Sequence, residues 1–300
     1  MKEIIKDLLK QKREKLSASS VKTYVSLLMS MYNKNKDDKD NGDNKEWFTE
    51  NTRKVLKSFS ELPPNRRKTQ LSALYIVTTD PEVHAEMLKD IKIVNDENKL
   101  QKKTASQEQG WMSIDEIKAV YDKLKEQATK MLSNKMPINY EQIVQFFLVG
   151  FLGAGVSGLS PRRSLDYALL KYKNYDVNTD NYIDKKGVLH FNIFKTEKFY
   201  GPQELNMKGE APALFELHKK WAKINPSDHV LFSSTQQPLT SSNITKIFSK
   251  IFEGRRISTS LFRHIFLSDQ YKNVPALAKM QKTAQEMSHS VDQALLYVKK

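Results

Sequence analysis

The sequence predicts a mainly α-helical protein with one small β-sheet and two domains. Helical periodicity and helix-start signals recur through most of its 300 residues. One short stretch, 188–194, alternates in the way that is typical of a strand. A polar stretch without periodicity, 101–110, separates two parts of the chain, and a hydrophobic content of 39% allows each part its own core.

The first hundred residues are predicted to be entirely helical. The first ten form an amphipathic helix, and the serines within 17–20 can cap a second helix whose apolar face begins at Val21. Later elements are expected in this order: a polar loop at 34–45, helices over about 48–60 and 65–78, and a helix starting near Pro81. The basic cluster 65–68 fits a phosphate contact and a solvated turn equally well.

The second half opens with a clear helix start. Ser113 and Glu116 match a capping box directly after the aperiodic stretch. We therefore expect a first domain at 1–105, a linker at 106–112 and a second domain at 113–300. The elements expected in the second domain are helices within 113–170, strands at 188–194 and about 204–207, a helix from Pro212 to Asn225, and helices from Ser241 onward.

The net charge of the chain and the absence of several motifs limit the classes of function to consider. A formal net charge of +14 favours a polyanionic partner, nucleic acid before an anionic membrane. The longest apolar run, 143–152, is too short to span a bilayer and is expected as a buried helix. The N-terminus lacks a signal-peptide pattern, so we do not expect secretion. Cysteine is absent and no histidines have metal-ligand spacing, so no metal site is expected.

Four short stretches, far apart in the chain, carry the basic and nucleophilic side chains that phosphate chemistry needs. They are 161–167, 194–198, 260–264 and 287–290, the last followed by Tyr297. In the first, Arg163 has Asp166 three residues on, so the carboxylate could orient the guanidinium. A guanidinium binds two phosphate oxygens at once, which makes arginine a natural clamp for this group. Taken alone, the pair is more often a surface ion pair.

The second and third stretches carry further cations. Lys195 follows the expected strand and could protonate a leaving alkoxide, with Lys198 as its competitor and a solvated turn as the alternative. Arg263 lies among apolar residues and therefore needs a partner, either a phosphate or an internal carboxylate. Ser260 lies one helical turn before it on the same face, where its hydroxyl can donate to the same phosphate.

The fourth stretch ends near a tyrosine. His289 can add another donor, and Tyr297 follows eight residues later. A tyrosine hydroxyl attacks phosphorus only with activating neighbours such as cations. Without them, Tyr297 is a packing residue near the end of the chain.

Together these stretches resemble the tyrosine recombinase superfamily, most closely the integrases of virophages and large DNA viruses. The motif residues that correspond are Arg163 with Asp166, Lys195, Arg263, His289 and Tyr297. The resemblance implies a two-domain recombinase-like architecture, with a helical core-binding domain that clamps DNA and an α+β catalytic domain. It implies Tyr297 as the nucleophile of a site-specific recombinase or integrase that works through a 3′-phosphotyrosyl intermediate without a cofactor.

The resemblance also implies partners and a place of action. Double-stranded DNA is the expected partner, with a homotetramer formed on it. The expected location is inside the cell and on DNA, in the host nucleus or a viral factory if the protein serves viral genome integration.

The sequence departs from the family pattern in three places. Ser260 stands where the family usually has histidine, the spacing from His289 to Tyr297 is one residue shorter than is common, and only three residues follow Tyr297. Two alternatives therefore stay open. One is a type IB topoisomerase-like enzyme, and the other is a DNA-binding structural protein with a decayed active site.

Overall fold

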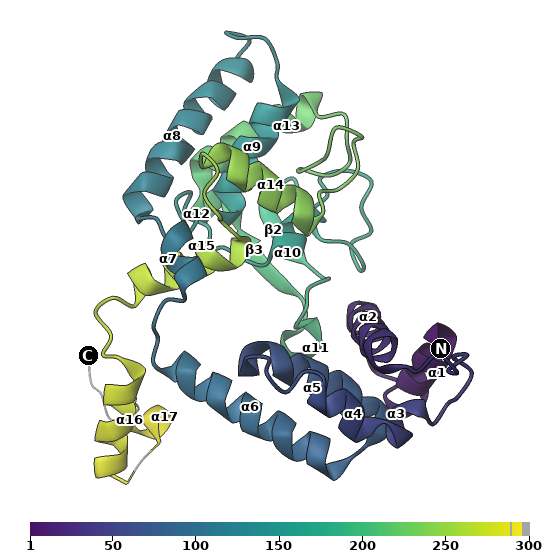
Figure 1. Cartoon of the computed structure of the whole chain (residues 1–300). Helices are drawn as coiled ribbons and strands as arrows, with labels where there is room; N and C mark the ends of the chain where they lie inside the picture. The colour runs from purple at the N-terminus through teal and green to yellow at the C-terminus, as the bar shows by residue number, and fades with distance from the viewer. Residues whose placement is uncertain (289, 296–300) are drawn as a thin grey trace. The chain divides into compact units, whose positions relative to one another are not determined.

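A computed structural model describes residues 1–288 and 290–295 (Figure 1). These residues form two compact units. The first unit contains Met1–Lys102 and the described residues from Pro275 onward, and the second contains Lys103–Val274.

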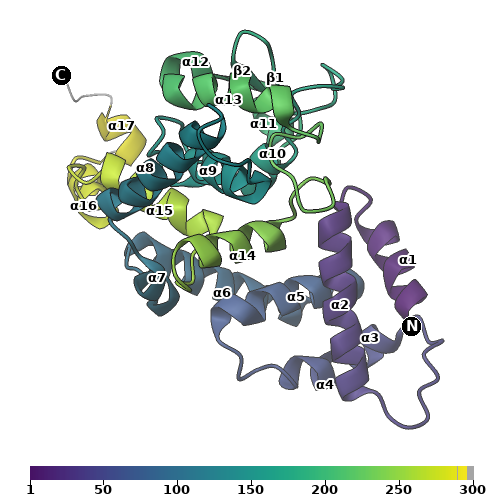
Figure 2. The same cartoon turned by 90° about the horizontal axis from the view of Figure 1, so that it is seen from above.

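The first unit is built from helices only. They are α1 (Lys2–Lys12), α2 (Ala18–Asn35), α3 (Trp47–Glu50), α4 (Thr52–Lys57), α5 (Pro64–Thr78), α6 (Pro81–Lys99), α16 (Leu277–Glu286) and α17 (Val291–Leu295). Figure 2 shows α1 and α2 side by side, and both helices pack on α5. Their shared core contains fully buried Leu28, Leu71 and Leu74.

Local signals start the helices of this unit where the sequence predicts. The Ser17 hydroxyl accepts a hydrogen bond from the Ser20 amide at 3.2 Å and caps α2. Pro64 opens α5, and the Asp80 carboxylate caps α6. The helix expected at about 48–60 is instead divided into α3 and α4 at Asn51, which ends one helix and precedes the next.

The second unit holds the β-sheet. Its helices are α7 (Ala105–Gly110), α8 (Ile114–Met131), α9 (Tyr140–Leu152), α10 (Ser164–Ala168), α11 (Glu197–Tyr200), α12 (Met207–Glu210), α13 (Pro212–Ile224), α14 (Ser241–Ile251) and α15 (Thr259–Gln270). Three antiparallel strands in the order β1-β2-β3 form the sheet: β1 (Tyr182–Ile183), β2 (Val188–Phe191) and β3 (Gln203–Asn206). In this register Phe191 faces Gln203.

Helix α9 forms the centre of this unit's core. Its residues from Ile143 to Leu152 are all buried, and α8 packs alongside it (Figure 1). Phe151 stacks on Tyr167 of α10 with ring centres 4.7 Å apart. The expectation of a buried core helix at 143–152 is thus confirmed. Within the described residues, no helix is long and apolar enough to cross a membrane.

The predicted fold class, mainly α with a small β-sheet, is confirmed. Two strands lie where the sequence predicts them, and the two-residue strand β1 was not expected. The stretch 101–110, expected to be aperiodic, contains α7, because Thr104 and Gln107 form a capping box that starts a helix. The functional division at 106–112 stays a prediction.

Candidate phosphate-binding site

A small pocket in the second unit lies between three of its elements. It has a volume of about 220 Å³. Its walls come from the start of α10, the segment between β2 and β3, and α15. The lining residues are Pro161, Arg162, Arg163, Asp166, Phe194, Thr196, Tyr200, Gln203 and Arg263.

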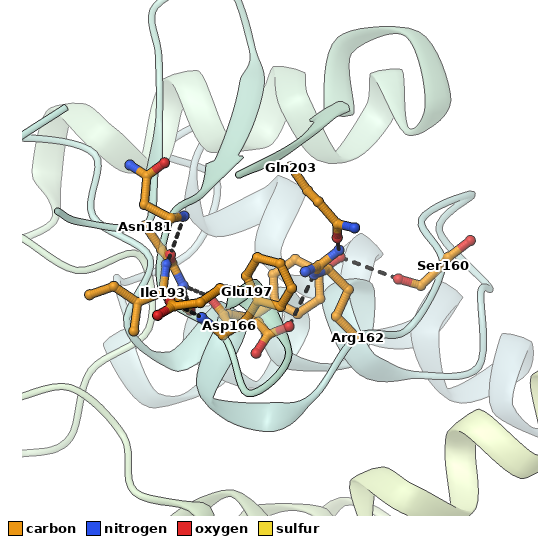
Figure 3. Close-up of polar contacts among 10 residues, drawn as sticks. Ser160, Arg162, Asp166, Asn181, Ile193, Glu197 and Gln203 are labelled. Atoms are coloured by element: carbon orange, nitrogen blue, oxygen red, sulfur yellow. Dashed lines mark hydrogen bonds and ion pairs between the residues drawn. The ribbon is translucent and has the colours of Figure 1, made fainter. Parts of the chain in front are cut away.

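One arginine of this pocket is held firmly by the protein itself. Arg162 donates from Nε to Asp166 Oδ2 at 3.1 Å and from Nη1 to Gln203 Oε1 at 2.7 Å (Figure 3). Its guanidinium also lies 4.1 Å from the centre of the Phe191 ring. Burial raises the pKa of Asp166, and the charge of Arg162 opposes that shift. Arg162 therefore connects α10 to the sheet.

This arrangement corrects the expectation that Asp166 orients Arg163. Residues three and four apart both share a helical face, so the sequence left either arginine able to reach the carboxylate. The hydrogen bond to Gln203 and the contact with the Phe191 ring hold Arg162, and not Arg163, beside the carboxylate. Within the described part of the chain, the Arg163 side chain has no hydrogen bond or ion pair, although its charge acts on both Asp166 and Arg263.

The other pocket arginine comes from α15 and is only partly satisfied. Arg263 Nε is buried and has no hydrogen-bond partner among the described residues. Its Nη2 lies 3.5 Å from Ser260 Oγ, at the long limit of a hydrogen bond. Burial lowers the pKa of Arg263, and the nearby positive charge of Arg163 lowers it further. Two guanidiniums that repel each other beside one pocket are stabilised when an anion enters.

The loop that carries Lys195 is anchored by a buried asparagine. Asn181 donates from Nδ2 to the carbonyls of Asp166 at 3.0 Å and Ile193 at 2.9 Å, and its Oδ1 accepts from the Ile193 amide at 2.8 Å (Figure 3). The Glu197 carboxylate accepts from the Phe194 amide at 3.4 Å. The base of the connection between β2 and β3 is therefore tied to α10.

The structure brings together some of the predicted site residues and not others. Arg163 and Arg263 line the same pocket, and Ser260 is exposed next to Arg263. Lys195 is exposed in the turn before α11 and does not line the pocket. His289 and Tyr297 lie outside the described residues.

Gln203, Thr196 and Tyr200 are among the pocket residues that were not predicted as site residues. Gln203 was not expected because its role depends on strand pairing. Thr196 and Tyr200 follow Lys195 closely, and the two adjacent aromatic residues at the end of α11, in an otherwise polar turn, were a usable signal. Among residues 1–288 and 290–295, no cluster of three or more histidine or acidic side chains could hold a metal ion.

No protein-family model and no curated protein matches the sequence. Seven chains of solved structures are similar in fold, and they include the following two. One is a lambda integrase dimer bound to a COC' core site, with 11% identity over 90% of each chain and a TM-score of 0.45. The other is XerA recombinase, with 14% identity over 99% of this chain and 94% of that chain and a TM-score of 0.35. At these values neither likeness establishes a family for the chain.

Proposed function

We propose that the chain is a site-specific DNA recombinase or integrase that cleaves and rejoins strands through a 3′-phosphotyrosyl intermediate. The observation that carries the proposal is the pair Arg163 and Arg263. Both line one small pocket, neither has a carboxylate partner among the described residues, and one has a buried donor without an acceptor. Such a pair suits the two non-bridging oxygens of a phosphodiester.

The charge of the whole chain supports a DNA substrate. A net charge of +14 gives affinity for the phosphate backbone without regard to sequence, and that affinity falls steeply with salt. The two guanidiniums would add specific stabilisation where negative charge builds up during reaction at phosphorus.

The proposed reaction exchanges one phosphoester bond for another. The Tyr297 hydroxyl gives up its proton to water, its oxygen forms a bond to phosphorus, and the bond from phosphorus to the 5′-oxygen breaks. Lys195 gives a proton to the departing 5′-oxygen, while His289 and Ser260 donate hydrogen bonds to the phosphoryl oxygens. Because the bond energy stays in the covalent intermediate, a 5′-hydroxyl of another strand can reverse the step without a nucleotide cofactor.

The proposal extends to the domains and the assembly. Residues 1–105 would form the core-binding domain and 113–300 the catalytic domain, joined at 106–112 and closed around duplex DNA. Strand exchange between two duplexes would then require a homotetramer on DNA. The protein would act on DNA inside the cell, in a host nucleus or viral factory if its task is viral genome integration.

Covalent capture of DNA tests the mechanism directly. A library of nicked duplexes with randomised sequence traps the intermediate, because the short strand beyond the cut diffuses away. The full chain should form an adduct that survives denaturing gel electrophoresis. Tyr297→Phe should bind the same library and form none. An adduct that persists in Tyr297→Phe and disappears in Tyr200→Phe would move the nucleophile to the tyrosine that lines the pocket.

Two further outcomes separate the alternatives. Transfer of a labelled strand between two marked duplexes is expected from a recombinase, whereas rejoining of the same strand alone indicates a topoisomerase-like enzyme. Tight DNA binding with no adduct in any variant would contradict the proposal and leave a passive DNA-binding protein.

A further inference from the structure

Two adjacent aromatic side chains in α11 are exposed to an unusual degree. Phe199 is 85% exposed and Tyr200 is 69% exposed. Among the described residues, the next most exposed large apolar side chain is Tyr271, at 61%. Single exposed apolar residues are ordinary, but two large exposed rings on consecutive residues of a short helix form a surface that a partner can cover.

The aromatic residues nearby show that this exposure is specific to the tip of the connection. Phe191 and Phe194, at its base, are buried and pack around the guanidinium of Arg162. Beyond Tyr200, Gly201 has a φ of +66° and no atom within 4 Å of where a Cβ would lie. The chain therefore reverses in open space directly after the two exposed rings.

The position of the tip indicates what the rings meet. Tyr200 lines the same pocket as Arg163 and Arg263. Lys195 and Lys198 are exposed on either side of the start of α11. Any molecule that reaches the two rings therefore meets a cluster of positive charge, which favours a polyanion with flat apolar groups. A nucleic acid combines both features, since each phosphate is followed by a base.

We propose that Phe199 and Tyr200 form an aromatic tip that stacks on an unpaired nucleobase next to the phosphate held by Arg163 and Arg263. The choice of DNA as the occupant rests on the proposed function. Stacking on an aromatic ring tolerates any base, because every base has a flat face. It requires that the base has left its neighbours in the duplex, so the aromatic tip favours opened DNA over paired DNA.

The anchoring of the connection makes this role physically reasonable. Asn181 ties Ile193 to the start of α10, and Glu197 holds the Phe194 amide. These contacts fix the base of the connection while leaving the tip free of them. The arginines would then bind a phosphate, and the aromatic tip would bind the base next to it in the same strand.

Binding of two duplexes of identical mixed sequence tests the proposal. One is fully paired, and the other has a single unpaired 2-aminopurine, whose fluorescence falls when it stacks. The full chain should bind the bulged duplex about five- to a hundredfold more tightly and quench its fluorescence. Phe199→Ala and Tyr200→Ala should each reduce that preference and the quenching. Tyr200→Phe should keep both, because it retains the ring.

The matched control is Tyr271→Ala, which removes another exposed ring that does not line the pocket. It should leave the preference unchanged. All these side chains are exposed, so the variants should melt at the wild-type temperature. Arg163→Ala should weaken binding of both duplexes alike and keep their ratio.

The test separates this inference from the proposed function. Preference for the bulge without any covalent adduct would keep the aromatic tip and reject the recombinase mechanism. Three results would contradict the proposed role of the aromatic tip. The wild type could bind the two duplexes with equal affinity, or Phe199→Ala could lower the affinity for both duplexes by the same factor. The protein could also form a dimer without DNA that Phe199→Ala dissociates. The last would assign the rings to contact with a second copy of the chain.

Discussion

Each of the two units contains a partly buried arginine, and the surroundings of the two arginines differ. In the first unit, Arg67 donates from Nε and Nη2 to the two oxygens of Asp90, both at 2.7 Å, and from Nη1 to the Ser60 carbonyl at 3.0 Å. The bonded carboxylate raises the pKa of Arg67. In the second unit, Arg263 has a buried Nε with no partner in the described structure, and burial lowers its pKa.

The difference separates a structural arginine from one that awaits a ligand. Arg67 belongs to the basic cluster 65–68, for which the sequence left a phosphate contact open. Its donors are used within the protein, so this residue serves the fold. Arg263 has a charge, a buried free donor and a pocket beside it, and a second cation faces the same pocket. All of these favour an external anion.

The largest expected effect is on catalysis at the unpaired arginines. Arg163→Ala and Arg263→Ala should each lower the rate of covalent adduct formation by about a hundred- to a thousandfold, because each removes a donor aimed at developing charge. Arg263→Met should melt at or slightly above the wild-type temperature, since it removes a partly buried charge whose buried Nε has no partner among the described residues. Rates measured on the nicked-duplex library check this.

Arg255→Ala is the matched control for these variants. Arg255 lies in the same unit but pairs with Glu116 at 3.3 Å on the surface. The Arg255→Ala substitution removes one positive charge away from the pocket, so it should change the rate of adduct formation little. A normal rate in Arg163→Ala would contradict the comparison and shift the phosphate contact to Arg162.

The second prediction concerns stability at the paired arginine. Arg67→Ala leaves the Asp90 carboxylate, which is 0% exposed, without its bidentate partner. The free energy of unfolding should fall by about 3–5 kcal/mol. Urea unfolding measures it, and Lys54→Ala, which breaks a surface pair with Asp37, should cost less than about 1 kcal/mol. A loss of similar size in the two variants would remove the distinction drawn here.

A second buried nitrogen without a partner shows that a missing partner alone does not identify a site. His218 Nδ1 also lacks a partner among the described residues, but burial lowers the pKa of this side chain to about 4, so it stays neutral. The unfolded chain would take up this proton near pH 6.5 and the folded chain only near pH 4. Stability from this group is therefore complete above pH 6.5 and falls as the pH drops toward 4.

The expected loss over that range is roughly 3 kcal/mol, since each pKa unit corresponds to about 1.4 kcal/mol. Denaturant unfolding at pH 7, 6, 5 and 4 measures it. His218→Leu should show a shallower fall than the wild type over the same range. Equal slopes for the two proteins would mean that His218 is hydrated or charged in the folded state.

These residues also show how far sequence reasoning reaches. Capping signals such as the one at Ser113 are local, so helix starts were predicted well. The isolation of Arg263 was foreseeable because apolar residues surround it in sequence. The choice between Arg162 and Arg163 as the partner of Asp166 was not, because it depends on Gln203, which strand pairing brings from 41 residues away.

The smallest expected effect is at Ser260, where the tyrosine recombinases that the sequence resembles usually have histidine. Its hydroxyl is exposed and lies 3.5 Å from Arg263 Nη2, so it can add one hydrogen bond to a bound phosphate. Ser260→Ala should therefore lower adduct formation by about tenfold. Ser260→His should be tolerated, because an imidazole can donate from the same helical face and can also take a proton near pH 7. A serine cannot take that proton, so the fall in adduct formation in Ser260→Ala should be smaller than the fall in Tyr297→Phe. If the two variants were equally inactive, Ser260 would take part in proton transfer, and the reaction would need a base that the arginine pocket does not supply.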